Sequence, residues 1–206
     1  PVSRARPATG CPEARPRDVA ILRLVLAPAR PSVGDVTRVD EYRARLRTLE
    51  TAHWQEFLTA HSGLPGPRGN IELGKAVAEE ADARTVDDLL TTDDEYLVFC
   101  GVVGLGRLLA DSGADADAHA LRARLREHAT DTRWRVREAV AMALQRLGDS
   151  DPSRMVDLVT DWAGDDHALV QRAAVAGICE PRLLRTPEMA RAAIDACERV
   201  TASLAA

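Results

Sequence analysis

The chain has 206 residues, a length that favours one domain and allows two at most. Its apolar residues are mainly Ala, Leu and Val, and only 3% of the chain is aromatic, which favours helices over a β-sandwich. The formal net charge of −5 argues against a protein that coats duplex nucleic acid non-specifically, because such proteins are normally basic.

No membrane span or secretory signal is recognisable. The apolar stretch at residues 19–27 is too short to cross a membrane and contains Arg23. It also lacks the small-residue cleavage site of a signal peptide. We therefore expect a cytoplasmic protein with no membrane partner. Lys75 is the only lysine among many arginines, a bias that we interpret as GC-rich, bacterial coding.

The N-terminal half is predicted to be irregular. Residues 1–16 contain four prolines and are expected to form an extended tail. Residues 17–93 are expected to be an irregular helical part of the same domain, with a short helix from Asp18 to Ala27 and a longer one over 39–61. The Pro- and Gly-rich segment 64–70 predicts a rigid loop that caps one end of the fold. Asn70 is a predicted N-cap for a helix over 71–81, and Thr85 for a turn through Leu90.

Residues 94–206 have a more regular pattern. It predicts helices over 94–111, 116–128, 132–147, 152–163, 167–179 and 187–204. Pro152 and Pro187 each follow a capping side chain at a helix start. Gly113, Gly148 and Gly164 stand where helices are expected to end. The loops are short, so consecutive helices should pack antiparallel.

One helical pattern recurs along this half of the chain. Each copy begins with a large apolar residue, continues with small residues and then has a large one. The three copies consist of Leu97, Cys100, Gly104, Leu105 and Leu108, of Val136, Ala139, Ala143, Leu144 and Leu147, and of Val170, Ala173, Gly177, Ile178 and Pro181. A single helical hairpin cannot bury such a face, so the copies are expected to stack.

Residues 136–149 resemble the second helix of a HEAT repeat, especially the short bacterial type also found in phycobilisome lyases. Asp131 completes that pattern, whereas in the next copy Gln171 replaces the arginine and Pro181 shortens the helix. The resemblance covers about half of the chain. It implies an all-α, armadillo-like fold: a right-handed α-α superhelix, or HEAT-like solenoid, in which the helices over 132–147 and 167–179 lie side by side and nearly parallel.

Glycines, cysteines and histidines carry little chemistry here. Gly101, Gly104 and Gly106 do not have the order of a phosphate-binding loop, and we interpret them as sites of close helix packing. The cysteines lack CxxC spacing, and Cys100, Cys179 and Cys197 are expected to be small buried hydrophobic residues. The histidines lack metal-ligand spacing. We predict no catalytic residue, no metal and no cofactor.

Charged residues are segregated along the sequence. Arginines are dense between 122 and 146, and acidic residues dominate 79–95. The arginines are either a solvated face with internal ion pairs or a groove for an anion. The acidic stretch either provides solubility or docks a basic partner. The candidate binding residues are Arg122, Arg126, Arg133, Trp134, Arg135 and Arg137.

Two functions remain open. The first is a non-catalytic scaffold that binds a protein or peptide on its concave face. The second follows from a distant similarity to HEAT-like DNA glycosylases that remove alkylated purines, enzymes that combine tryptophans with a carboxylate. It would require the five candidate arginines to form one groove, with Trp134 or Trp162 and an aspartate in its floor. Nucleic acid is therefore a possible second partner, and the oligomeric state is not predicted.

Overall fold

The computed structural model describes residues 33–66, 68–113 and 116–204, with side chains from 38 to 202 within these ranges. The expected tail over 1–16 and the short helix after Asp18 lie outside these ranges. Residues Pro31–Ala206 form one compact unit. Helices, turns and loops account for all of the described residues, and none of these is in a strand. The predicted all-α class is confirmed.

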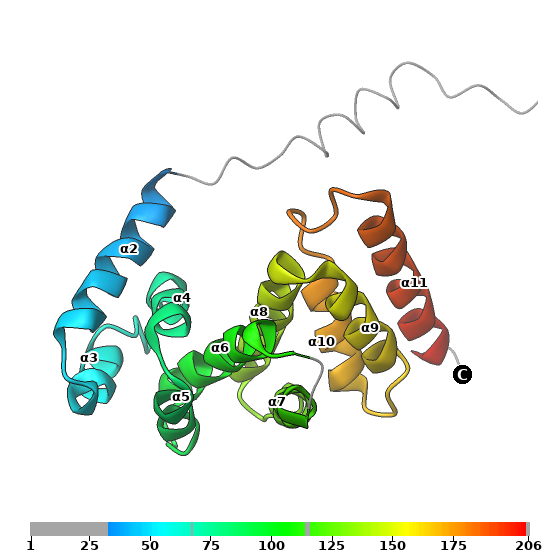
Figure 1. Ribbon diagram of the computed structural model, residues 1–206. Coiled ribbons are helices and arrows are strands. Elements are labelled where there is room, and N and C mark those ends of the chain that lie inside the picture. Colours follow the sequence, from blue (N-terminus) through cyan, green and yellow to red (C-terminus); the bar gives the residue numbers. More distant parts are fainter. Residues whose placement is uncertain (1–32, 67, 114–115, 205–206) are drawn as a thin grey trace, which may run out of the picture. The chain divides into compact units, whose positions relative to one another are not determined.

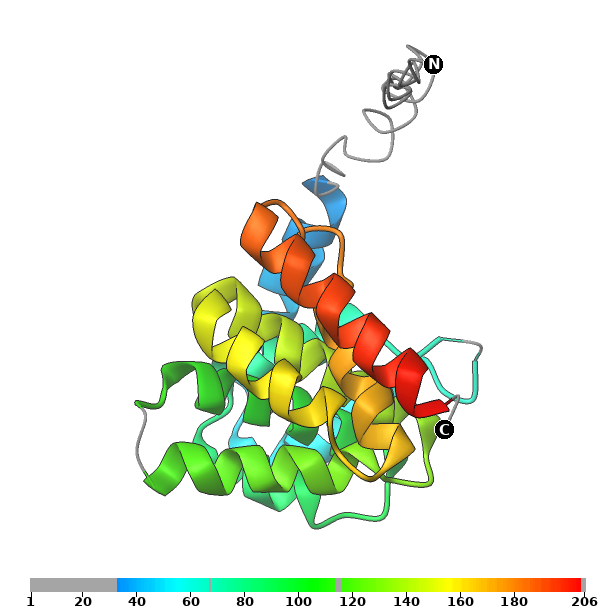
Figure 2. The ribbon, with the colours of Figure 1, turned by 90° about the vertical axis from the view of Figure 1, so that its right-hand side faces the viewer.

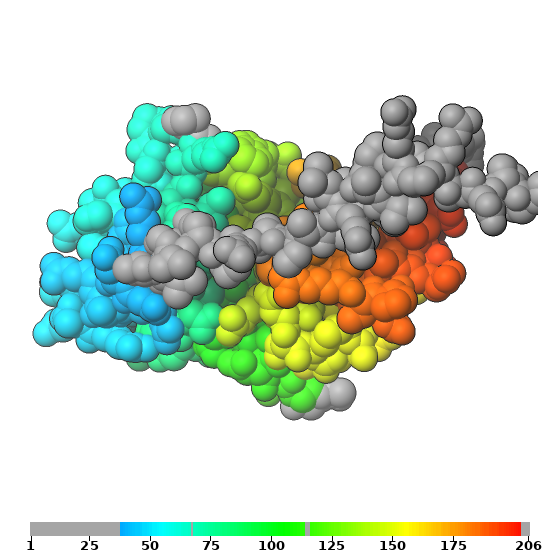
Figure 3. Space-filling model, turned by 90° about the horizontal axis from the view of Figure 1, so that it is seen from above, coloured from blue at the N-terminus to red at the C-terminus, as the bar shows by residue number. Residues whose placement is uncertain are grey.

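The helices follow one another with short connections (Figure 1). In chain order they are α2 (Val33–Thr48), a 3-10 turn (Thr51–His53), α3 (Trp54–Ala60), α4 (Ile71–Glu80), α5 (Ala83–Leu90), α6 (Glu95–Asp111), α7 (Ala116–Ala129), α8 (Trp134–Ser150), α9 (Pro152–Ala163), α10 (Ala168–Ile178) and α11 (Pro187–Leu204). Seen from above, the blue α2 and the red α11 lie at opposite ends of the unit (Figure 3).

Two predicted boundaries in the N-terminal part are wrong. The single helix expected over 39–61 is broken after α2, where Glu50 is extended (φ −63°, ψ 139°). The break allows α2 to pack on α4 while α3 turns to pack on α6, so burial overrides local propensity. The cap of α5 is Asp82, whose carboxylate accepts from the Thr85 amide at 2.7 Å, and Thr85 lies buried inside the helix.

Helix α8 also runs further than expected, because Gly148 lies within it and does not end it. A Cβ at this position would clash with the sulfur of Met155 and crowd Leu183. The glycine therefore leaves room for these two side chains. The helix ends at Asp151, which leaves helical geometry and caps α9 by accepting from the Arg154 amide at 3.1 Å.

Helices α4, α6, α8 and α10 form a row in which each packs on the next. Glu95 and Arg135 approach each other near the starts of α6 and α8, with 3.6 Å between charged atoms. Further along, Gly106 of α6 faces Ala143 of α8. From the first contact to the second, the residue number rises in both helices. Helices α6 and α8 are therefore parallel.

The same holds for α8 and α10. Leu144 faces Gly177 within the helices, and beyond the helix ends Asp149 forms an ion pair with Arg182 at 3.0 Å. The two helices therefore lie side by side and parallel, as expected from the repeat. Helix α9 packs on both of them, and α11 packs on α9 and α10 (Figure 2).

The three clustered glycines hold α6 against two neighbours. A Cβ at Gly101 or Gly104 would lie 2.7 Å from Leu90 or Val86 of α5, respectively. The residue number rises from Gly101 to Gly104 along α6 but falls from Leu90 to Val86 along α5. The two helices are therefore antiparallel. Gly106 faces α8 instead. The expectation of close helix packing is confirmed.

The turns that precede α8 and α10 repeat one hydrogen-bond pattern. The carboxylates of Asp131 and Asp165 each accept from the backbone amide two residues later, at 2.8 Å. Six residues after each aspartate, Arg137 and Gln171 donate to that aspartate's backbone carbonyl, at 2.6 and 2.7 Å. Gln171 therefore makes the same contact as the arginine that it replaces, and the two turns are equivalent despite the substitution.

The loop over 64–70, described except for Pro67, packs against helix starts. Gly66 accepts a hydrogen bond from Arg135 at 3.3 Å, and Gly69 lies against the ring of Tyr96. Gly63, just before the loop, has φ +75°, a conformation that favours glycine. The loop therefore covers the starts of α6 and α8, in the middle of the helix row.

Glu80 joins α2 to α4. Its carboxylate accepts from Arg43 at 2.7 Å and from Arg47 at 2.6 and 2.8 Å, and its side chain is only 13% exposed. The hydrogen bond from Arg47, followed by that from Arg43, lowers the pKa of Glu80 below its ordinary value of 4.5. The packing of α2 on α4 is therefore stabilised partly by the negative charge of Glu80, which is lost when the carboxylate is protonated in acid.

A carboxylate with a lowered pKa in the folded state stabilises that state above its unfolded pKa, and this stabilisation is lost as pH falls through the folded pKa. We expect the Glu80→Gln variant to lose about 1 kcal/mol of stability at neutral pH. Below about pH 4.5 its free energy of unfolding should fall less steeply than that of the wild type. Urea unfolding at a series of pH values measures both effects. Parallel curves for the two proteins would contradict this assignment.

Candidate functional site: a groove along the helix row

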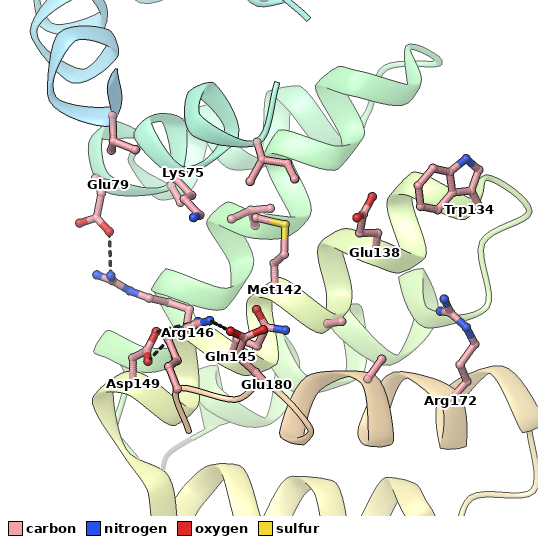
Figure 4. A pocket seen from close by; sticks show the side chains of 17 residues that line it. Lys75, Glu79, Trp134, Glu138, Met142, Gln145, Arg146, Asp149, Arg172 and Glu180 are labelled. Atoms are coloured by element: carbon pink, nitrogen blue, oxygen red, sulfur yellow. Dashed lines mark hydrogen bonds and ion pairs between the residues drawn. The ribbon is translucent and has the colours of Figure 1, made fainter. Parts of the chain in front are cut away.

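A groove of about 740 Å³ runs along one face of the helix row (Figure 4). Most of its walls come from α4, α8 and α10, with one residue each from α2 and α6, and the segment after α10 closes one end. The lining residues are Val39, Ile71, Lys75, Ala78, Glu79, Val103, Trp134, Glu138, Ala141, Met142, Gln145, Arg146, Asp149, Arg172, Ala176, Glu180 and Arg182. Parallel helices thus bring together side chains that are distant in sequence.

An exposed indole marks one end of the groove. Trp134, the first residue of α8, is 48% exposed. The guanidinium of Arg135 lies 5.0 Å from the centre of its ring, within the range of a cation–π contact. A second cavity of about 350 Å³ shares Ile71, Trp134 and Glu138 with the groove and extends to Tyr96. The apolar surface therefore continues around Trp134.

Ion pairs occupy the opposite end of the groove (Figure 4). Arg146 of α8 pairs with Glu79 of α4 at 2.8 Å. Arg182 pairs with Asp149 at 3.0 Å and with Glu180 at 2.9 Å. These pairs link three segments of the wall and leave little free charge at this end.

Three charged side chains between these ends are free. Lys75, Glu138 and Arg172 line the groove and have no hydrogen bond or ion pair with the rest of the described chain. Lys75 and Arg172 are exposed, and Glu138 is half-buried. The described lining as a whole is neutral, with four basic and four acidic side chains, because Arg182 is shared by two carboxylates. The positive charges without a partner lie at Lys75 and Arg172.

The candidate binding residues from the sequence lie in different surroundings. Trp134 lines the groove, and together with Arg135 it lines the adjoining cavity. Arg122 lies beside His119 on α7, in a separate pocket bounded by α9. Arg126 pairs with Asp165 at 2.7 Å.

The two remaining candidates hold the turn before α8. The guanidinium of Arg133 donates to the Asp131 carboxylate at 2.7 and 2.9 Å, and Arg137 donates to the Asp131 backbone oxygen. The hydrogen bonds from Arg133, chiefly those of its side chain, lower the pKa of Asp131 below its ordinary value. Both arginines therefore have partners within the fold.

The acidic and basic stretches are partners of one another. Arg124 pairs with Asp87 at 2.6 Å, Arg135 with Glu95, and Arg146 with Glu79. Asp82 and Asp94 of the acidic stretch cap helices α5 and α6. The segregation seen in the sequence thus becomes a set of ion pairs between different helices, as in the internal ion-pair alternative.

Sequence reasoning missed Lys75, Glu138, Met142 and Arg172. Glu138 and Met142 follow Trp134 at intervals of four, which places the three on one face of α8. This spacing could have identified the groove-lining face of α8 from the sequence, because the repeated apolar positions occupy a different face of the helix. No spacing in the sequence indicates that Lys75 and Arg172 share that surface.

The described lining of the groove contains no serine, threonine, cysteine or histidine. No group of three or more possible metal ligands occurs among the described residues, and no helix in this part of the chain is long and apolar enough to span a membrane. Comparisons with family models, with curated proteins and with solved structures found no match. The geometry of the groove is therefore the basis for inferring function.

Proposed function

We propose that this protein is a non-catalytic, HEAT-like helical-repeat scaffold that binds a peptide segment of a partner protein in the groove. The parallel row α4–α6–α8–α10 and the matching turns at Asp131 and Asp165 support a superhelix of stacked repeats. In such a fold, one helix from each repeat contributes to a continuous binding face. The observation that carries the proposal is the exposed Trp134 at the end of a groove with charged walls.

The groove favours a partner of particular chemistry. Met142, Ala141 and Ala176 provide an apolar floor beside Trp134, which suits one large apolar side chain. Lys75 and Arg172 offer free positive charge, whereas Glu138 is the one free carboxylate of the described lining. We therefore expect a short segment in which an apolar residue is flanked by acidic residues. Local charge, and not the net charge of the chain, determines this preference.

The placement of the residues gives less support to the alternative, a glycosylase of alkylated purines. Arg122 and Arg135 line different pockets, and Arg126 and Arg133 are engaged with Asp165 and Asp131. Trp162 is only 2% exposed. We therefore give preference to the scaffold.

Selection of peptides from a random displayed library against the full chain tests the proposal. The selected peptides are expected to contain an apolar residue flanked by glutamate or aspartate. Their dissociation constants should rise at least about tenfold for Trp134→Ala, because an exposed tryptophan in a groove is a typical hot spot. Fluorescence polarisation of a labelled peptide measures the change.

Two matched controls make this result specific. Ile194 of α11 is the other exposed large apolar residue of the described chain, at 56% exposure, and Ile194→Ala should change affinity by less than about twofold. The double variant with Lys75→Ser and Arg172→Ser should weaken binding and reduce its dependence on salt, whereas Arg185→Ser outside the groove should not. Peptides that bind the Trp134 variant as tightly as the wild type would refute the proposed site.

A further inference from the structure

Two cysteines meet near the C-terminal end of the chain. Cys179 is the residue that ends α10, and Cys197 lies in the third turn of α11. Their Sγ atoms are 3.7 Å apart. Cys179 is exposed and Cys197 is half-buried, so the sequence-based expectation that both are buried is wrong. Cys100, by contrast, is fully buried, as expected.

We propose that Cys179 and Cys197 form a redox site, in which a low-molecular-weight disulfide such as oxidised glutathione converts the two thiols into an intramolecular disulfide. A disulfide requires its sulfur atoms about 2.05 Å apart, so the two atoms must approach by about 1.7 Å. Cys179 lies where helix α10 gives way to a loop.

The reaction consists of two exchange steps. The thiolate of exposed Cys179 attacks one sulfur of oxidised glutathione, and one glutathione leaves as its thiolate. The thiolate of Cys197 then attacks the Cys179 sulfur of this mixed disulfide and releases the second glutathione. Two protein thiols are oxidised, one glutathione disulfide is reduced, and the two protons pass to the departing thiolates.

The surroundings make the first step slow and the second favourable. Partial desolvation of its sulfur, followed by the neighbouring thiol, raises the pKa of Cys179 to about 11. Little thiolate is therefore present at neutral pH, and attack on glutathione disulfide is slow. Once the mixed disulfide exists, Cys197 is already adjacent to it, so the second attack is intramolecular and has a high effective concentration.

The disulfide would link the two ends of a segment that borders the groove. Residues 180–196 lie between the two cysteines, and among them Glu180 and Arg182 line the end of the groove. Leu183, also in this segment, is buried against Gly148 of α8. Oxidation would therefore restrict the segment that closes the groove. The redox inference itself does not depend on what the groove binds.

The test uses the full chain with Cys11→Ser, a change that leaves the pair intact. After incubation with oxidised glutathione, trypsin should yield the fragments 173–182 and 192–199 joined by a disulfide, detected by mass spectrometry. The linked form should melt roughly 4 to 8 °C higher than the reduced form, because the bond closes a loop in the unfolded chain. Dithiothreitol should reverse both changes.

Single variants separate the two steps. With Cys197→Ser, a stable glutathione adduct should accumulate on Cys179, and with Cys179→Ser little adduct should form on Cys197. Both reduced variants should melt close to the reduced parent, which shows that they fold; Cys197→Ala replaces the serine variant if they do not. The proposal is overturned if the parent accumulates the Cys179 adduct without the internal bond, or if both thiols stay free.

Discussion

The Gly106→Ala variant is expected to lose about 3 kcal/mol of unfolding free energy. A Cβ at this position would lie 2.5 Å from the Cα and 2.9 Å from the backbone oxygen of Ala143. These atoms belong to the backbone of α8 and cannot rotate away, so α6 and α8 must move apart. Overpacking usually costs about 1–3 kcal/mol, and the rigid neighbour places this site at the upper end, even after the better helix propensity of alanine.

Urea unfolding measures this loss, and Gly69→Ala provides the matched control. At Gly69 the nearest atom to an added Cβ is 3.7 Å away, on the ring of Tyr96, which is an ordinary contact. The control should change stability by less than about 1 kcal/mol. Equal losses in the two variants would show that the approach of α6 and α8 is not what requires glycine at position 106.

A loss of about 2 to 3 kcal/mol is expected for Asn70→Ala, because Asn70 connects three elements. Its Oδ1 accepts from the Leu73 amide at 3.1 Å and caps α4. Its Nδ2 donates to the Tyr42 hydroxyl of α2 at 2.9 Å and to the His61 carbonyl at 3.0 Å. A cap contributes about 1 kcal/mol, and each further hydrogen bond about 0.5–1.5 kcal/mol.

Asn70→Asp separates these contributions. Aspartate keeps the acceptor that caps α4, at a helix end that favours negative charge, but it lacks the two amide donors. We expect the aspartate variant to lose about 1 to 2 kcal/mol, which is less than the alanine variant loses, because the cap is kept. Thermal or urea unfolding at neutral pH compares the two. If both variants are equally destabilised, the cap contributes nothing, and the link to α2 and the end of α3 carries the whole effect.

Local signals determined most helix starts and the helix type itself. Asn70 and Asp151 cap the helices that the sequence assigned to them, because a capping side chain acts within three residues of itself. Gly177 of the repeated pattern and Gly106 of the glycine cluster indicated where helices approach closely, and the structure places both against α8.

The break between α2 and α3 and the partners of the arginines depend on tertiary contacts, which no local sequence pattern indicates. No proline or glycine marks the break between α2 and α3; the chain turns there because the two helices bury against different partners. The arginine-rich stretch suggested one surface, but several of its members pair with acidic residues that are distant in sequence, as Arg124 does with Asp87. A charge run in sequence specifies the sign of the charge but not its partner.

The groove and the thiol pair were likewise hidden in the sequence. Trp134 was already a candidate binding residue in the sequence, whereas Lys75 and Arg172 reach the same surface only because α4 and α10 belong to one row. Cys179 and Cys197 are 18 residues apart and meet because α10 and α11 pack together. The sequence alone determined an all-helical chain with its caps, close-packing positions and one copy of the repeat. Which side chains share a surface depended on how the helices pack, since burial acts between residues that are distant along the chain.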